Sequence, residues 1–136
     1  MFLLDTNVIS ELRVGKANPS AAVRRWAGSV AGNQLYLSAV SILELEMGVL
    51  LMERKDAPQG QMLRSWFQGV LKQFCLQVLP FGSTTAVLFA AMHVPDRRPD
   101  RDAMIAATAK EHGYTIATRN TADFDDCGVQ LLNPWL

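Results

Sequence analysis

Four acidic residues in this 136-residue sequence stand where a predicted strand gives way to a turn, or in the first turn of a predicted helix. They are Asp5, Glu44, Asp102 and Asp123. In an open parallel sheet such turns gather at the carboxyl edge, so we expect the four side chains to converge. Clustered carboxylates repel one another unless a cation lies between them, and Mg²⁺ binds carboxylates together with waters and phosphate oxygens. The spacing therefore favours a divalent-cation site that activates a water for phosphoryl chemistry.

Each acid taken alone has an ordinary structural explanation. Asp5 is a preferred residue type for a helix N-cap, and Ser41-Ile42-Leu43-Glu44 matches the S-x-x-E capping box. Asp102 and Asp123 would complement a helix dipole, Asp102 two residues after a capping Asp100. For any one acid the capping explanation is favoured, whereas the four together favour the cation site.

The elements that must position these acids are short apolar strands alternating with helices. The predicted strands are Phe2–Leu4, Leu35–Leu37, Gln77–Leu79, Tyr114–Ala117 and Val129–Leu132. The predicted helices are Val8–Leu12, Ala21–Gly28, Ile42–Arg54, Pro58–Phe74, Thr84–His93 and Asp100–His112, the last ended by Gly113. This alternation predicts one α/β domain over residues 1–136, with a mainly parallel sheet and helices on both faces.

Composition excludes several other classes of protein. Lys plus Arg and Asp plus Glu each number 13, which argues against a broad polybasic nucleic-acid surface. Cys75 and Cys127 lack a CxxC spacing, so neither a disulfide framework nor a zinc site is expected. The opening residues lack a basic leader, and Pro80 and Gly82 interrupt the longest uncharged stretch. We therefore expect a reduced, cytoplasmic protein without a membrane segment.

Charged residues near the four acids have two interpretations. Arginines cluster before Asp102 and near Asp123, either to balance charge or to contact a nucleic-acid backbone, and the residues alone leave both open. These arginines are Arg97, Arg98, Arg101 and Arg119. A second group is interpreted as a solvated face rather than as outer support for the acids: Ser10, Glu11, Asp125 and Asp126.

Two apolar stripes have helical spacing and are expected to pack within the protein. They are Met47 with Val49–Leu51, and Trp66, Phe67, Leu71 and Phe74. Any excess over what a monomer buries would indicate a dimer or a partner groove.

Four motifs together resemble the PIN-domain family, in particular the VapC and FitB toxins of type II toxin–antitoxin modules. The segments are Leu3–Glu11, Ser41–Gly48, Arg101–Ala109 and Thr118–Phe124, followed by Gly128-Val129 and Asn133–Trp135. They span nearly the whole chain in the order of the family.

The resemblance implies a small α/β/α sandwich that binds Mg²⁺ or Mn²⁺ and cleaves RNA. By position, the acidic metal ligands would be Asp5, Glu44, Asp102 and Asp123, with Thr6 and Thr118 as polar supports. Asn120 stands where many relatives have an aspartate, which leaves open whether one or two metals bind and whether Asp125 takes part. The resemblance also implies a homodimer and a cognate antitoxin that places a side chain into the acidic site.

The leading hypothesis is thus a metal-dependent endoribonuclease toxin, and two alternatives are kept. The first is an aspartate-nucleophile phosphatase of the haloacid-dehalogenase type, in which Asp5 would attack phosphate. Asn7 stands where that class needs a general-acid aspartate, which counts against it. The second is a non-catalytic module whose acidic pocket docks an arginine of a partner.

Overall fold

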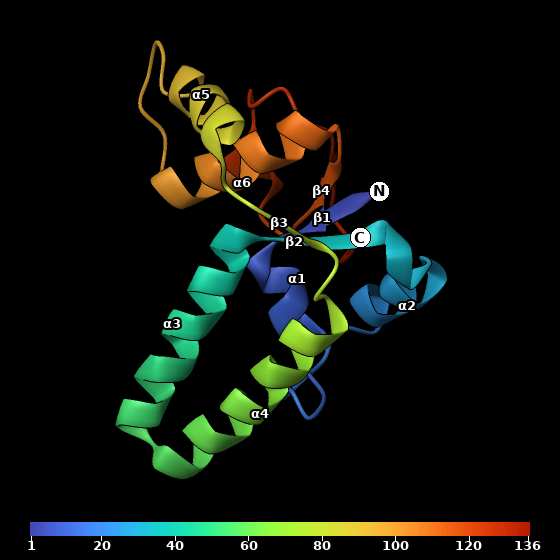
Figure 1. Cartoon of the computed structure of the whole chain (residues 1–136). Coiled ribbons are helices and arrows are strands. Elements are labelled where there is room, and N and C mark those ends of the chain that lie inside the picture. The colour runs from blue at the N-terminus through green and yellow to red at the C-terminus, as the bar shows by residue number, and fades with distance from the viewer.

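Five parallel strands form the centre of the computed structural model, which describes residues 1–136 (Figure 1). The strand order is β3-β2-β1-β4-β5. The strands are β1 (Phe2–Leu4), β2 (Leu35–Ser38), β3 (Val78–Leu79), β4 (Thr115–Ala117) and β5 (Leu131–Leu132). Phe2 of the central strand pairs with Leu35 on one side and Thr115 on the other. Because every pairing is parallel, the carboxyl ends of all five strands meet at one edge.

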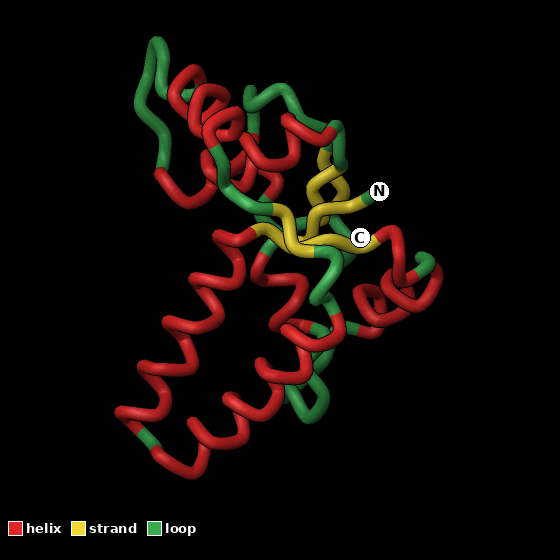
Figure 2. Tube along the Cα trace, viewed as in Figure 1, coloured by secondary structure: helices red, strands yellow, loops and turns green.

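Helices cover both faces of this sheet, so the predicted α/β fold with a parallel sheet is confirmed (Figures 1 and 2). One face carries α1 (Thr6–Glu11), α2 (Ala21–Ser29), α3 (Ala39–Lys55) and α4 (Ala57–Gln73). The other face carries α5 (Ser83–Ala91) and α6 (Asp100–His112). The chain also has two short 3₁₀ helices, η1 (Gly32–Gln34) and η2 (Thr121–Phe124). No helix is both long and apolar enough to cross a bilayer.

Alternate residues of the strands build a separate core on each face. On β1, Leu4 belongs to the core shared with α1–α4, whereas Leu3 belongs to the core shared with α6. Successive strand side chains point to opposite faces, so a strand buried on both sides is apolar at consecutive positions. This is why Phe2-Leu3-Leu4 was recognisable as a buried strand.

The two longest helices, α3 and α4, form a hairpin that projects away from the sheet (Figure 1). The hairpin turns at Asp56, whose side chain accepts a hydrogen bond from the Gln59 amide and caps α4, with proline in its first turn. Arg64 of α4 pairs with Glu46 and Glu53 of α3, which ties the two helices together.

The apolar stripe of α3 is only partly buried, contrary to the expectation that it packs within the protein. Val49 is buried, but Met47, Leu50 and Leu51 are exposed. In α4, Phe67 is buried as expected, whereas Leu71 is exposed. The hairpin therefore shows an apolar surface that this chain does not cover.

The predicted elements occur in the predicted order, with ends shifted by a few residues. Gly113 ends α6 with a φ of 71°, a left-handed conformation that glycine adopts without strain, as predicted. Asp100 is not a cap: it is the first residue of α6, and Pro99 precedes it without a side-chain hydrogen bond.

Candidate active site

Asp5 lies where β1 ends and α1 begins, and it is 7% exposed. One carboxylate oxygen, Oδ1, accepts a hydrogen bond of 2.8 Å from the Thr6 amide, so Asp5 does cap α1. The other, Oδ2, accepts a 2.7 Å bond from the Thr118 hydroxyl and a 3.2 Å bond from the Asn7 amide group. The capping and site interpretations of Asp5 therefore hold together, because the helix start and β4 fix the same carboxylate.

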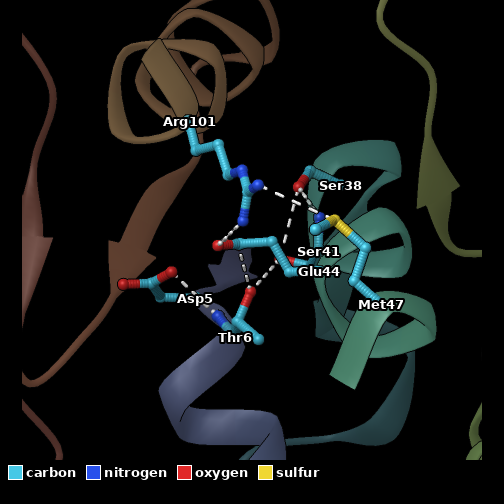
Figure 3. Close-up of polar contacts among 7 residues, drawn as sticks. All are labelled: Asp5, Thr6, Ser38, Ser41, Glu44, Met47 and Arg101. Atoms are coloured by element: carbon cyan, nitrogen blue, oxygen red, sulfur yellow. Dashed lines mark hydrogen bonds and ion pairs between the residues drawn. The ribbon is translucent and has the colours of Figure 1, made fainter. Parts of the chain in front are cut away.

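Glu44 of α3 is tied to the same helix start through Thr6 (Figure 3). The Thr6 hydroxyl donates to Glu44 Oε1 at 2.8 Å and lies 3.0 Å from the Ser41 hydroxyl, which is 3.4 Å from that of Ser38. Since a hydroxyl has one hydrogen, Thr6 gives it to the carboxylate and accepts from Ser41. Ser38 and Ser41 are fully buried, so this chain of hydroxyls is shielded from water.

The capping-box interpretation of Ser41 and Glu44 is wrong. The helix α3 begins at Ala39, and its cap is Ser38, whose hydroxyl accepts a 3.0 Å bond from the Ser41 amide. Glu44 is thus beyond the first residues of the helix, and its carboxylate turns to Thr6 rather than to a backbone amide of α3.

Asp102 in the first turn of α6 and Asp123 in η2 complete the group of acids. The pKa of Asp102 is raised to about 6, chiefly by burial and then by the charges of Asp123, Asp5 and Glu44. The pKa of Asp5 is also raised, mainly by burial and further by Glu44 and Asp123, although the hydrogen bonds from Thr118 and Thr6 oppose this. The fold thus brings the four predicted acids within electrostatic reach of one another.

These acids suit a hard divalent cation, although they do not form a finished cage. No three of them lie close enough together to constitute a ready-made metal site. Their oxygens are the ligand type of Mg²⁺ and Mn²⁺, and Mg²⁺ retains several waters instead of requiring an all-protein shell. After burial, which is the larger cause, the charges of the neighbouring acids also raise the pKa values of Asp5 and Asp102. A cation bound here would offset this mutual repulsion.

The sequence matches the PIN domain family over residues 2–129. The chain belongs to the PIN-domain family. It is 37% identical to a protein of Sinorhizobium fredii named VapC ribonuclease Y4jK, with 99% of this chain and 98% of that protein covered. It is 35% identical to the toxin FitB of Neisseria gonorrhoeae, over 99% of each chain.

A solved structure of FitAcB from Neisseria gonorrhoeae has the same fold, with a TM-score of 0.87, 37% identity and 99% of each chain covered. The chain is therefore a PIN-domain protein of the VapC/FitB type, as the four motifs predicted. The haloacid-dehalogenase alternative is set aside, since it belongs to a different family.

Of the predicted supporting residues of this PIN-domain chain, Thr6 and Thr118 contact the acids directly. The backbone amide of Asn120 donates to the Thr118 hydroxyl at 3.0 Å. Asp125 is exposed and follows η2, and its backbone carbonyl accepts a bond from Arg98. The hydrogen bonds thus link Asn120 to the site through its backbone, whereas the Asp125 carboxylate accepts no hydrogen bond from the site residues.

Sequence reasoning missed three polar residues that hold the acids. Asn7 bonds to both Asp5 and Thr118 and accepts from the Arg119 amide, and Ser38 and Ser41 support Thr6. The sequence signal that could have identified them is that they are small polar residues in or near the motifs that contain the acids. 

The solvated-face interpretation of Glu11 is also wrong. Glu11 is 6% exposed, accepts a 3.0 Å bond from the Ser20 amide and pairs with Lys16 at 3.3 Å. It holds the turn between α1 and α2 rather than the acidic site.

Arg101 is the one predicted arginine that contacts an acid of the site. Its Nη1 lies 3.7 Å from Glu44 Oε2. The other three are engaged elsewhere, and their partners are Asp100 for Arg97, the Asp125 carbonyl for Arg98 and the Trp135 ring for Arg119.

Proposed function

We propose that this PIN-domain protein is a Mg²⁺- or Mn²⁺-dependent endoribonuclease, the toxin of a type II toxin–antitoxin module. The observation that carries the proposal is the convergence of four acids from β1, α3, α6 and η2, close enough that the charges of the other three add to the effect of burial on the pKa of Asp102. PIN-domain ribonucleases generally depend on a divalent metal. The Sinorhizobium fredii protein that is similar to this chain over nearly its whole length is named a VapC ribonuclease. We place the activity in the whole chain, residues 1–136, acting as one domain.

In this proposal Asp5, Glu44, Asp102 and Asp123 hold the cation. A bound divalent cation attracts phosphate oxygens and lowers the pKa of water, which makes water a nucleophile toward a phosphodiester. Thr6 keeps Asp5 and Glu44 in fixed relative positions, because its amide bonds to the first and its hydroxyl to the second. Thr118 anchors Asp5 to the end of β4.

The remaining two carboxylates provide the adaptable part of the site. Neither Asp102 nor Asp123 accepts a hydrogen bond from another side chain. They are therefore able to adjust to a cation and its waters at little cost. Asp102 must lose its proton to act as a ligand, so we expect cation binding to weaken as the pH falls below about 6.

A cognate antitoxin and a homodimer belong to the same proposal. A similar protein is named toxin FitB, and a similar structure is named FitAcB. The exposed apolar surface of α3 offers an area for such a partner or a second copy. A soluble toxin of this kind would act in the cytoplasm, with RNA as its substrate.

Cleavage of a total-RNA pool by the purified, antitoxin-free chain tests the proposal, in Mn²⁺, in Mg²⁺ and in EDTA. Asp5→Asn is the test variant, and Asp56→Asn is its matched control because Asp56 also caps a helix, at the far end of the hairpin. We expect discrete fragments from the parent and from Asp56→Asn. EDTA and Asp5→Asn should each abolish them.

Two results would contradict the proposal. Full cleavage by a folded Asp5→Asn chain would remove Asp5 from the machinery. A parent chain that binds Mn²⁺ in calorimetry but leaves every RNA intact would favour the non-catalytic module with an acidic docking pocket.

A further inference from the structure

Arg101 reaches from the first turn of α6 across to α3, where its guanidinium meets two side chains (Figure 3). Nη1 lies 3.7 Å from Glu44 Oε2, and Nη2 lies 3.7 Å from the Met47 sulfur. The side chain is half exposed, at 50%. Arg101 therefore stands between the acidic site and solvent, next to the proposed metal ligands Glu44 and Asp102.

The contacts of this guanidinium leave most of its hydrogen-bonding capacity unused. A guanidinium has five N–H donors. The 3.7 Å separation from Glu44 is longer than a hydrogen bond, and a thioether sulfur is a weak acceptor. If Arg101 served only to neutralise the acids, it would be expected to form a close, two-pronged pair with a carboxylate. The remaining N–H groups of its guanidinium are free to donate to a stronger acceptor.

We infer that Arg101 binds a phosphate of the RNA backbone immediately beside the acidic site, with Glu44 and Met47 holding its guanidinium there in the free protein. The inference rests on the proposed ribonuclease function and adds an anion subsite to it. The planar fork of arginine matches two phosphate oxygens at once, which lysine does not achieve. If Glu44 served as a ligand of a bound cation, a substrate phosphate would take the place of Glu44 as the partner of Arg101.

The surroundings single out Arg101 among the arginines of this surface. Arg97 has a similarly long ion pair, 3.8 Å from Asp100, but Asp100 is not one of the four acids. Arg98 donates to the Asp125 carbonyl, and Arg119 lies over the Trp135 ring. Only Arg101 combines contact with a site acid, partial exposure and unused donors.

Three variants of the full chain test this subsite. Arg101→Gln removes the charge, and Arg101→Lys keeps the charge but loses the planar guanidinium that binds two oxygens at once. Arg54→Gln is the matched control. Arg54 is an exposed arginine in the last turn of α3, at the tip of the hairpin, without an ion pair. The probe is a fluorescein-labelled single-stranded RNA of mixed sequence, whose binding is followed by anisotropy in Ca²⁺ while its integrity is checked on a gel. Calorimetry measures Mn²⁺ affinity in parallel.

We expect Arg101→Gln to weaken RNA binding about tenfold, the effect of losing one charge-assisted contact. Arg101→Lys should recover part of this loss, and Arg54→Gln should bind as the parent does. Mn²⁺ affinity of Arg101→Gln should be unchanged or higher, because a competing positive charge has been removed.

Three outcomes overturn the inference and are distinguishable from one another. Parent-like RNA affinity in Arg101→Gln, with a parent that cleaves, removes the subsite but leaves the ribonuclease intact. A fall in Mn²⁺ affinity that matches the fall in RNA affinity assigns Arg101 to positioning Glu44 instead. A parent that neither binds nor cleaves RNA removes the subsite together with the proposed function.

Discussion

At the scale of single residues, the acidic site has a fixed half and an adaptable half. Thr6 serves two carboxylates at once, since its amide bonds to Asp5 and its hydroxyl to Glu44. Ser41 and Ser38 extend this connection into the buried start of α3. Asp102 has no comparable support, and its charge is disfavoured by burial and by the other acids.

The raised pKa of Asp102 predicts that this carboxylate destabilises the metal-free fold at neutral pH. Its pKa is about 6 in the folded chain and 3.8 as the ordinary value, so the folded state binds more protons between these values. The free energy of unfolding therefore falls as the pH rises from about 4 to 6. Asp102→Asn removes the charge and should raise the free energy of unfolding at pH 7 by about 1 kcal/mol, a figure reduced for solvent screening.

Urea unfolding in EDTA at pH 7 and pH 4 measures this effect. The gain from Asp102→Asn should disappear at pH 4, where the parent carboxyl is also protonated. Asp56→Asn provides the control, because it removes a carboxylate that caps α4 far from the site. If Asp102→Asn were less stable than the parent at pH 7, this would contradict the conclusion that the charge of Asp102 destabilises the metal-free fold.

At the scale of elements, the α3–α4 hairpin depends on one close approach between its helices. A Cβ on Gly60 would lie against the Glu53 Cα, a backbone atom, well inside van der Waals contact distance. A Cβ added to Gly69, on the same helix, would meet no atom within 4 Å. Glycine is therefore required at the first position and dispensable at the second.

Gly60→Ala should lower the free energy of unfolding by roughly 2–3 kcal/mol, because the two helix backbones must separate. Gly69→Ala should raise it by roughly 0.5–1 kcal/mol, since alanine favours the helix. Urea denaturation of both variants beside the parent tests the pair. Equal effects of the two substitutions would mean that the hairpin tolerates separation at Gly60.

The sequence predicted the elements well where a local signal defines them. Apolar runs marked the strands, Gly113 marked the end of α6, and the strand ends placed the four acids at one edge. The start of α3 was missed because Ser38 and Ser41 are equally good caps locally, and only the tertiary fold brings Thr6 beside Ser41. Glu11 was misjudged for the same reason: its burial depends on a turn that folds Ser20 back onto it.

At the scale of the whole molecule, charge is balanced overall and separated locally. The 13 basic and 13 acidic residues cancel, yet four acids converge at the carboxyl edge of the sheet. A protein without net charge exerts little long-range attraction on a polyanion. RNA must therefore be held by a few contacts near the site, with the cation and Arg101 foremost among them.

This distribution of charge predicts a shallow dependence of RNA affinity on salt. For single strands the logarithm of affinity falls with the logarithm of salt by about 0.7 per neutralised phosphate. Two or three phosphate contacts would give a slope of roughly −1.4 to −2.1. Anisotropy of the labelled RNA over a KCl series, at constant Ca²⁺, measures it. A slope steeper than about −4 would contradict this prediction, because it would require a broad basic surface that the balanced composition does not supply. The protein would then have to bind RNA as an assembly whose subunits combine their arginines.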